Sequence, residues 1–149
     1  MKPEQKLYQK LKKNTPNILW TRLETWVSFG VPDLLGYHNL CGFFMVELKI
    51  QTANKIRFSP HQILFHTLRT NRNYILVEQA RKRGPQALKL YGSKSIEGLL
   101  LDPREVKPLA VNDFQLIENI LINKKNKYTR AANLRGPSGP TRHPPRLKA

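Results

Sequence analysis

The stretch that decides the fold is FFMVELKI, residues 43–50, because it combines the composition of a buried strand with two charged residues. In a strand, alternation with a period of two places Glu47 and Lys49 on one face, while the apolar residues between them face the other way. A charged side chain inside a protein is costly unless it is paired, so these two residues need a reason to be there. A salt bridge at the rim of a sheet is one such reason, and a catalytic site is another.

A second acid lies in the apolar segment that precedes this strand. Asp33 is embedded in GVPDLL, residues 30–35, and the sequence HNLCG, residues 38–42, predicts a hairpin between the two segments. Folding this hairpin can bring Asp33 near Glu47. Neighbouring carboxylates repel each other, which is tolerable with a divalent cation between them, and oxygen ligands without cysteine or histidine favour Mg²⁺ or Mn²⁺ over zinc. With Lys49 nearby to stabilise the developing charge, water activated by such a cation could hydrolyse a phosphodiester bond.

Sequence patterns predict further elements around these segments. We expect helices over residues 3–13, from Ser59 to about Arg69, and over residues 114–121. We expect strands over residues 18–26, 31–37, 43–50, 74–77 and 87–91. The order αβββαβ predicts an α/β fold with a mixed sheet flanked by helices. In the second helix, Ile63, Leu64 and Leu68 are expected to face the core. Five aromatic residues are expected in the core and not as base-stacking platforms, which is the alternative for them: Trp20, Trp26, Phe29, Phe43 and Phe44.

The charge of the chain points to a polyanionic partner. Its 149 residues include 26 Lys and Arg against 10 Asp and Glu, which gives a net charge of +16. Residues 123–149 hold eight of the basic residues and no acid, together with several prolines and glycines. This composition predicts a disordered basic tail, which leaves residues 1–122 as one domain. Nucleic acid is the expected partner, and an anionic membrane surface is the weaker alternative.

Several other classes of protein are disfavoured. A single cysteine, Cys41, excludes an internal disulfide framework. No apolar run approaches the roughly 20 residues needed to cross a bilayer, and the charged first residues do not resemble a signal peptide. We therefore expect a cytoplasmic protein with no membrane association.

The acids and the lysine resemble a known family in their order along the chain. Asp33 followed by Glu47 and Lys49 resembles the signature of the PD-(D/E)XK nuclease superfamily. The longer series RLE (22–24), GVPD (30–33), VELK (46–49) and SPHQ (59–62) is similar to the stand-alone VRR-NUC and Holliday-junction-resolvase-like branch, many of whose members are phage-encoded. The resemblance covers about residues 3–79. It implies a restriction-endonuclease-like core, location in a bacterial host if the chain is phage-encoded, and a Mg²⁺-dependent DNA endonuclease with branched or junction DNA as the candidate substrate.

The resemblance also implies roles for particular residues. Asp33 and Glu47 would be metal ligands together with the backbone carbonyl of Leu48, and Lys49 would be the catalytic lysine. Gln62 matches a glutamine that faces the site in this branch. We expect Mn²⁺ to substitute for Mg²⁺.

A third acid would complete the metal site, and two candidates compete for that place. Glu4 is the acid of the predicted first helix, and Glu24 lies shortly before the GVPD segment. Glu24 could instead pair with a nearby basic residue. A homodimer is also implied, because junction-resolving relatives pair two sites.

Basic residues outside the signature are candidates for phosphate contacts, although solvated loop charges are the commoner case. These candidates are Lys55, Arg57, Arg81, Lys82, Arg83, Lys124 and Lys125. Two alternative functions stay open. One is a non-catalytic, architectural DNA-binding protein, and the other is an RNA-directed nuclease.

Overall fold

The computed structural model of the chain describes residues 1–23 and 29–123. The predictions made for Glu24, Trp26, Lys124, Lys125 and the remainder of the basic tail therefore lie outside the described residues. No helix in the described part of the chain is long and apolar enough to cross a membrane.

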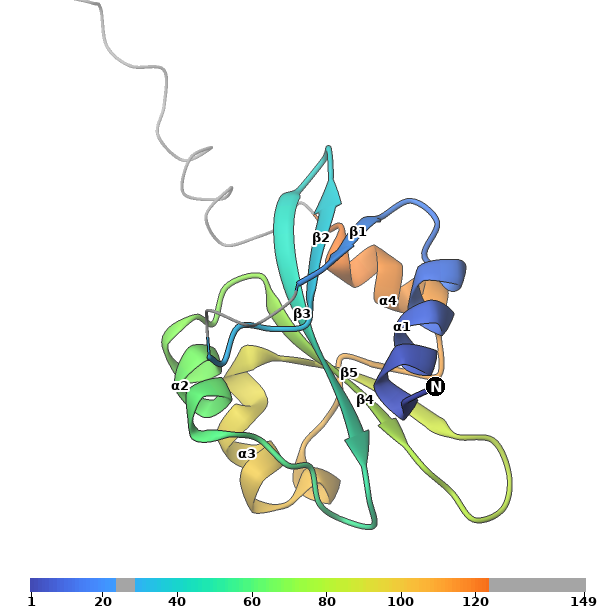
Figure 1. Cartoon of the computed structure of the whole chain (residues 1–149), viewed down its shortest axis with the longest axis vertical. Coiled ribbons are helices and arrows are strands. Elements are labelled where there is room, and N and C mark those ends of the chain that lie inside the picture. The colour runs from blue at the N-terminus through green and yellow to red at the C-terminus, as the bar shows by residue number, and fades with distance from the viewer. Residues whose placement is uncertain (24–28, 124–149) are drawn as a thin grey trace, which may run out of the picture.

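The described residues form a six-stranded sheet with helices on both faces (Figure 1). In chain order the elements are α1 (Pro3–Asn14), β1 (Leu19–Arg22), β2 (Leu34–His38), β3 (Gly42–Gln51), α2 (Pro60–Leu68), β4 (Asn73–Gln79), β5 (Ala87–Gly92), the 3₁₀ helix η1 (Ser93–Ser95), α3 (Ile96–Leu101), the 3₁₀ helix η2 (Pro103–Glu105), β6 (Ala110–Val111) and α4 (Phe114–Leu121). The predicted order αβββαβ is confirmed for the first six of these elements.

The strands lie in the sheet in their sequence order, from β1 at one edge to β6 at the other. All neighbouring strands are antiparallel except β3 and β4, which are parallel. A parallel pair needs a crossover connection, and α2 supplies it. The expected mixed α/β sheet flanked by helices is therefore confirmed.

Two hydrophobic cores lie on opposite faces of the sheet. On one face, Leu7 and Leu11 of α1 and Ile117 and Leu121 of α4 pack with sheet residues that include Leu48. On the other face, the second core joins residues of β4 and β5 to α3 and to the segment that precedes α2; its members are Ile56, Ile75, Val77, Tyr91, Ile96 and Leu99. The side chains of the candidate site lie on this second face.

Two predicted strands are shorter or shifted in the structure. The strand expected over residues 18–26 is observed as Leu19–Arg22, and Leu23 follows it outside the ladder. The strand expected over residues 31–37 begins only at Leu34. Pro32 has no N–H to donate to a ladder, which is consistent with a strand that starts after it. As a result Asp33 lies just before β2 and not within it.

The predicted inward face of α2 is wrong at Leu64 and Leu68, while Ile63 is half-buried. Leu64 and Leu68 are 55% and 67% exposed, whereas His66 is completely buried and its Nδ1 lies 2.6 Å from Ser93 Oγ. Gln62 and His66 are four residues apart and so share one side of the helix, and this side faces the sheet. The helix is therefore oriented by polar contacts, which its apolar pattern does not reveal.

The predicted burial of the aromatic residues is correct for Trp20 and Phe44 and wrong for two others. Phe29 is 78% exposed and Phe43 is 61% exposed. Because successive strand residues face opposite sides, only one of Phe43 and Phe44 can enter the core beneath α1 and α4. Phe44 takes that place, and Phe43 instead contacts the ring of Tyr37, with 4.8 Å between the ring centroids.

Candidate active site

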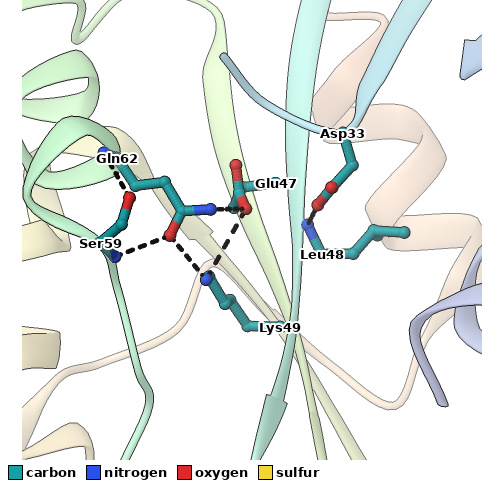
Figure 2. A network of polar contacts seen from close by, with 6 residues as sticks. All are labelled: Asp33, Glu47, Leu48, Lys49, Ser59 and Gln62. Atoms are coloured by element: carbon teal, nitrogen blue, oxygen red, sulfur yellow. Dashed lines mark hydrogen bonds and ion pairs between the residues drawn. The ribbon is translucent and has the colours of Figure 1, made fainter. Parts of the chain in front are cut away.

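The two charged residues of β3 project from the same face of the sheet, as their spacing predicts. Val46 and Leu48 are buried in the core beneath α1, while Glu47 and Lys49 point toward α2 (Figure 2). Lys49 Nζ lies 3.8 Å from Glu47 Oε1. The Glu47 side chain is buried, and Lys49 is half-buried beside it. This strand therefore presents a carboxylate and an ammonium group next to each other in a largely desolvated place.

The register of the hairpin brings Asp33 to Glu47. Leu34 of β2 pairs with Val46 of β3, so the residue before Leu34 arrives opposite the residue after Val46. Asp33 Oδ2 accepts a 2.8 Å hydrogen bond from the backbone N–H of Leu48. This bond holds the carboxylate of Asp33 close to that of Glu47, as Figure 2 shows.

Gln62 joins α2 to both charged residues of β3. Its Nε2 donates to Glu47 Oε1 at 2.8 Å, and its Oε1 accepts from Lys49 Nζ at 2.8 Å (Figure 2). The same Oε1 accepts from the backbone N–H of Ser59 at 3.0 Å, and Ser59 Oγ accepts from the backbone N–H of Gln62. Ser59 and Gln62 thus form a capping box, which places the glutamine side chain at the start of the helix. The expectation that Gln62 faces the site agrees with this geometry, although its functional role stays a prediction.

The environment of Glu47 opposes its ionisation. Burial, followed by the nearby Asp33 carboxylate, raises the pKa of Glu47 to about 9, against the opposing effect of Lys49. Its Oε2 is buried and accepts no hydrogen bond from the described residues. A buried oxygen without a donor, next to a second carboxylate, fits a bound divalent cation, because a cation would compensate both the repulsion and the missing hydrogen bond.

The donor set therefore suits a hard cation such as Mg²⁺, with Asp33 and Glu47 as the carboxylate ligands. Within residues 1–23 and 29–123, no group of three or more Asp, Glu, His or Cys residues is gathered as a metal site. The carbonyl of Leu48 and a third acid stay predictions. Of the two competing acids, Glu24 lies outside the described residues, while Glu4 lines a hollow together with Lys49.

Two hollows lie along the loop between β3 and α2, and the first of them is beside Lys49. The first, of about 440 Å³, is lined by Glu4, Lys49, Ile50, Thr52, Lys55 and Arg57. The second, of about 390 Å³, shares Lys55 and Arg57 with the first and also includes Arg104. The structure therefore brings two of the predicted phosphate contacts next to Lys49. Arg81, Lys82 and Arg83 are exposed in the loop between β4 and β5 and line neither hollow.

The structure adds two residues, Ser59 and Phe58, that the sequence analysis did not assign to the site. Ser59 reads as a helix cap, yet its backbone N–H also fixes the amide of Gln62. Phe58 lies below Lys49, with 4.8 Å between Nζ and the ring centroid, which is a cation–π contact. The sequence SPHQ contains the spacing of a capping box, so the first of these could have been found from that spacing.

No model of a protein family matches the sequence, and no curated protein sequence matches it either. Among solved structures, the chain is similar to Hjc, a Holliday junction resolvase from the archaeal hyperthermophile Archaeoglobus fulgidus. The TM-score is 0.43 and the sequence identity 18%, over 61% of this chain and 73% of the other.

Proposed function

We propose that this chain is a nuclease that hydrolyses phosphodiester bonds in DNA with the help of Mg²⁺. The observation that supports the proposal is the meeting of two carboxylates, Asp33 and Glu47, with a lysine beside them, in a chain of net charge +16. Glu47 is buried with one oxygen unpartnered, which is costly for stability. A purely structural role would be served better by an apolar residue at this position.

The residues of the site divide the chemistry among them. Asp33 and Glu47 would hold the cation, which polarises a phosphoryl oxygen and lowers the pKa of water when it is bound. Lys49 presents its ammonium group on the same face and can stabilise the charge that develops on the phosphate. Gln62 keeps the Lys49 ammonium and the Glu47 carboxylate in a fixed relation through two hydrogen bonds. The chain thus positions its charges before the substrate arrives.

The hollow beside Lys49, and the second hollow that shares Lys55 and Arg57 with it, would hold the substrate backbone. Lys55 and Arg57 are exposed and line both hollows, so they can neutralise phosphates on one side of the scissile bond. Contacts of this kind position a nucleic acid without reading its sequence. They would serve DNA or RNA equally well, so the test includes both.

The experiment is a cleavage assay on plasmid, linear duplex, single-stranded, flap and four-way junction DNA, and on RNA, with Mg²⁺, Mn²⁺ or EDTA. We expect cleavage of DNA with either cation and none in EDTA. We expect Asp33→Ala, Glu47→Ala and Lys49→Ala to lower the rate at least about 1,000-fold while DNA affinity stays within a few-fold, since charge that develops in the transition state is what the site stabilises. Glu78→Gln is the matched control, because Glu78 is also a buried acid of the sheet but is bonded to Lys10 on the opposite face.

Full activity of the Glu47→Ala and Lys49→Ala proteins in a clean preparation would refute the mechanism. Binding without cleavage of any substrate would favour the architectural alternative, and cleavage restricted to RNA would favour the RNA-directed one. The preference for branched DNA, the homodimer, membership of the VRR-NUC branch and a phage origin stay predictions from the sequence.

A further inference from the structure

An exposed aromatic stack lies at the start of α2, next to the candidate active site. The ring of Phe29 stacks on that of His61, with 5.2 Å between the centroids and 26° between the planes. Phe29 is 78% exposed, so most of its side chain stays open to solvent. His61 is also exposed. We call this pair the Phe29–His61 stack.

The backbone fixes the Phe29–His61 stack in place. Gly30 has a φ of +82°, and a Cβ at this position would lie 2.4 Å from the carbonyl oxygen of His61. The turn at residues 29–30 therefore packs directly against the backbone of α2, which only a glycine allows. In Figure 1, the chain that leads from this turn into β2 begins beside α2. The turn that carries Phe29 is thus fixed against the helix, while the ring itself contacts His61 and otherwise stays exposed.

The Phe29–His61 stack is also tied to the site through the sequence of α2. His61 immediately precedes Gln62, which donates to Glu47 and accepts from Lys49. The hollow that Lys49 lines together with Lys55 and Arg57 offers charges for phosphates. A strand of nucleic acid bound in that hollow would lie at Lys49, whose partner Gln62 is the neighbour of His61 in α2.

A single exposed phenylalanine needs no explanation, since much of any protein surface is apolar. A phenylalanine that is already stacked on a second ring, on the helix whose next residue, Gln62, contacts Glu47 and Lys49, is different, because it matches how proteins hold unpaired bases. Bases within a continuous duplex are stacked on both faces by their neighbours. Only an unpaired or extruded base can lie on such a ring.

Resting on the proposed nuclease function, we propose that the Phe29–His61 stack binds an unpaired base of the DNA next to the bond that is cut. The substrate class is then DNA with unpaired nucleotides at the cleavage position, such as a flap, a single-stranded end or an open junction, and not continuous duplex. Phe29 is then a specificity-determining residue, and His61 holds the Phe29 ring in position by stacking on one of its faces.

A second exposed aromatic pair provides an internal control. Tyr37 and Phe43 also contact each other, but their rings are inclined by 50°. Phe43 lies four residues before Glu47 along β3, which corresponds to about 13 Å at the rise of a strand. Its exposure of 61% is similar to that of Phe29, so Phe43→Ala removes an exposed phenylalanine without touching the stack.

The test measures binding in EDTA, where no cleavage is expected, with full-length protein and oligonucleotides that carry 2-aminopurine. The fluorescent base is placed either in a single-stranded flap or inside a blunt duplex. We expect wild-type protein to quench the flap base by stacking. We expect Phe29→Ala to abolish the quenching and raise the Kd for flap DNA about five-fold or more, while Phe29→Trp preserves both. Phe43→Ala should behave as wild type, and the Kd for blunt duplex should stay within two-fold in all variants.

An unchanged flap Kd and unchanged quenching in Phe29→Ala would overturn the inference, and so would an equal loss of affinity for blunt duplex. Phe29-dependent quenching of RNA alone would overturn the choice of DNA. Thermal unfolding of Phe29→Ala is measured in parallel, and His61→Ala, which should weaken the quenching, is the second variant if the first does not fold. Cleavage is not the readout, so the two proposals can fail separately. A wild-type protein that stacks bases without cutting DNA would refute the nuclease proposal alone. A protein that cuts DNA without Phe29-dependent stacking would refute this inference alone.

Discussion

Gln62 contacts Glu47 through its amide nitrogen, with 2.8 Å between Nε2 and Oε1, and the surrounding donors prevent the opposite orientation. The amide oxygen of Gln62 accepts from both Lys49 Nζ and the backbone N–H of Ser59. A reversed amide would place its NH₂ group against these two donors. The helix cap at Ser59 therefore determines which atom of Gln62 meets Glu47, and so couples the start of α2 to the site.

This coupling predicts the effect of Gln62→Ala. Removing the amide takes one partner from Glu47 and one from Lys49 without removing either charge. We expect the cleavage rate to fall about 10- to 100-fold, as for other residues that orient metal ligands, with little change in DNA affinity. Single-turnover kinetics beside a binding titration separates these two quantities. Gln115→Ala, on the exposed side of α4, is the control, and a Gln62→Ala protein that cleaves at the wild-type rate would show that the amide does not orient the site.

The raised pKa of Glu47 predicts how stability depends on pH in the absence of divalent cations. Burial and the Asp33 carboxylate raise this pKa from 4.5 to about 9 in the folded protein. Between these values the folded state keeps a proton that the unfolded state has lost, so the free energy of unfolding falls as the pH rises. The slope from this one group approaches about 1.4 kcal/mol per pH unit. Below pH 4.5 both states are protonated and the contribution to the slope disappears.

Urea unfolding in EDTA at several values between pH 5 and pH 9 measures this slope for wild type and Glu47→Gln. The glutamine variant cannot ionise, so we expect it to gain stability relative to wild type as the pH rises. Addition of Mg²⁺ at high pH should stabilise wild type and have little effect on the variant. Parallel stability curves for the two proteins would contradict the assignment of Glu47 as a carboxyl that is protonated when the site is empty of cations.

The close approach of Gly30 to α2 predicts a large effect of Gly30→Ala. The substitution forces a Cβ against the His61 carbonyl oxygen and also places alanine at a φ of +82°. Gly84 has a similar φ of +86°, but a Cβ there meets nothing within 4 Å. Gly84→Ala is therefore the matched control and should cost about 1–2 kcal/mol through backbone strain alone. Gly30→Ala should cost about 1–3 kcal/mol more from overpacking.

Chemical denaturation of the two alanine variants measures this difference. Gly30→Ala should also lower the cleavage rate, because the displaced helix start carries Gln62. Equal stability of the two variants would mean that the turn at residues 29–30 moves away from α2 without penalty, and that it does not hold the stack in place.

Much of the candidate site could be predicted because it depends on short-range rules. A period of two in β3 is enough to place Glu47 and Lys49 on one face, and a hairpin of ordinary length is enough to bring Asp33 to them. The helix start at Ser59 is also a local signal. The position of Gln62 facing the site came from the resemblance, and the structure explains it through the capping box.

The remaining features depend on contacts between elements that are distant in sequence. Phe29 and Leu64 are apolar, so the sequence alone favours burial for both, yet both are exposed. Their exposure depends on which faces of the helices and strands pack together. The orientation of α2 follows from the buried contacts of His66 and Gln62. Both residues are polar, so the hydrophobic pattern of the helix predicts that they face outward. Glu4 lines the same hollow as Lys49 because α1 packs on β3, which is also a contact between distant elements. These contacts are set by tertiary packing, so periodicity alone does not reveal them.

The basic tail of residues 123–149 leads to the last prediction. Its eight lysines and arginines carry half of the net charge of +16. Each phosphate that these residues neutralise should contribute about −0.9 to the slope of log K against log salt concentration. A full-length variant with all eight changed to glutamine should therefore bind duplex DNA more weakly and with a flatter slope, as measured by anisotropy titrations from low to moderate salt. A tail of the same composition in scrambled order should keep the wild-type slope, since the effect depends on charge and not on sequence. If the neutralised variant retains the wild-type slope, the phosphate contacts come from the folded domain, and Lys55, Arg57 and the loop at residues 81–83 become the residues to change next.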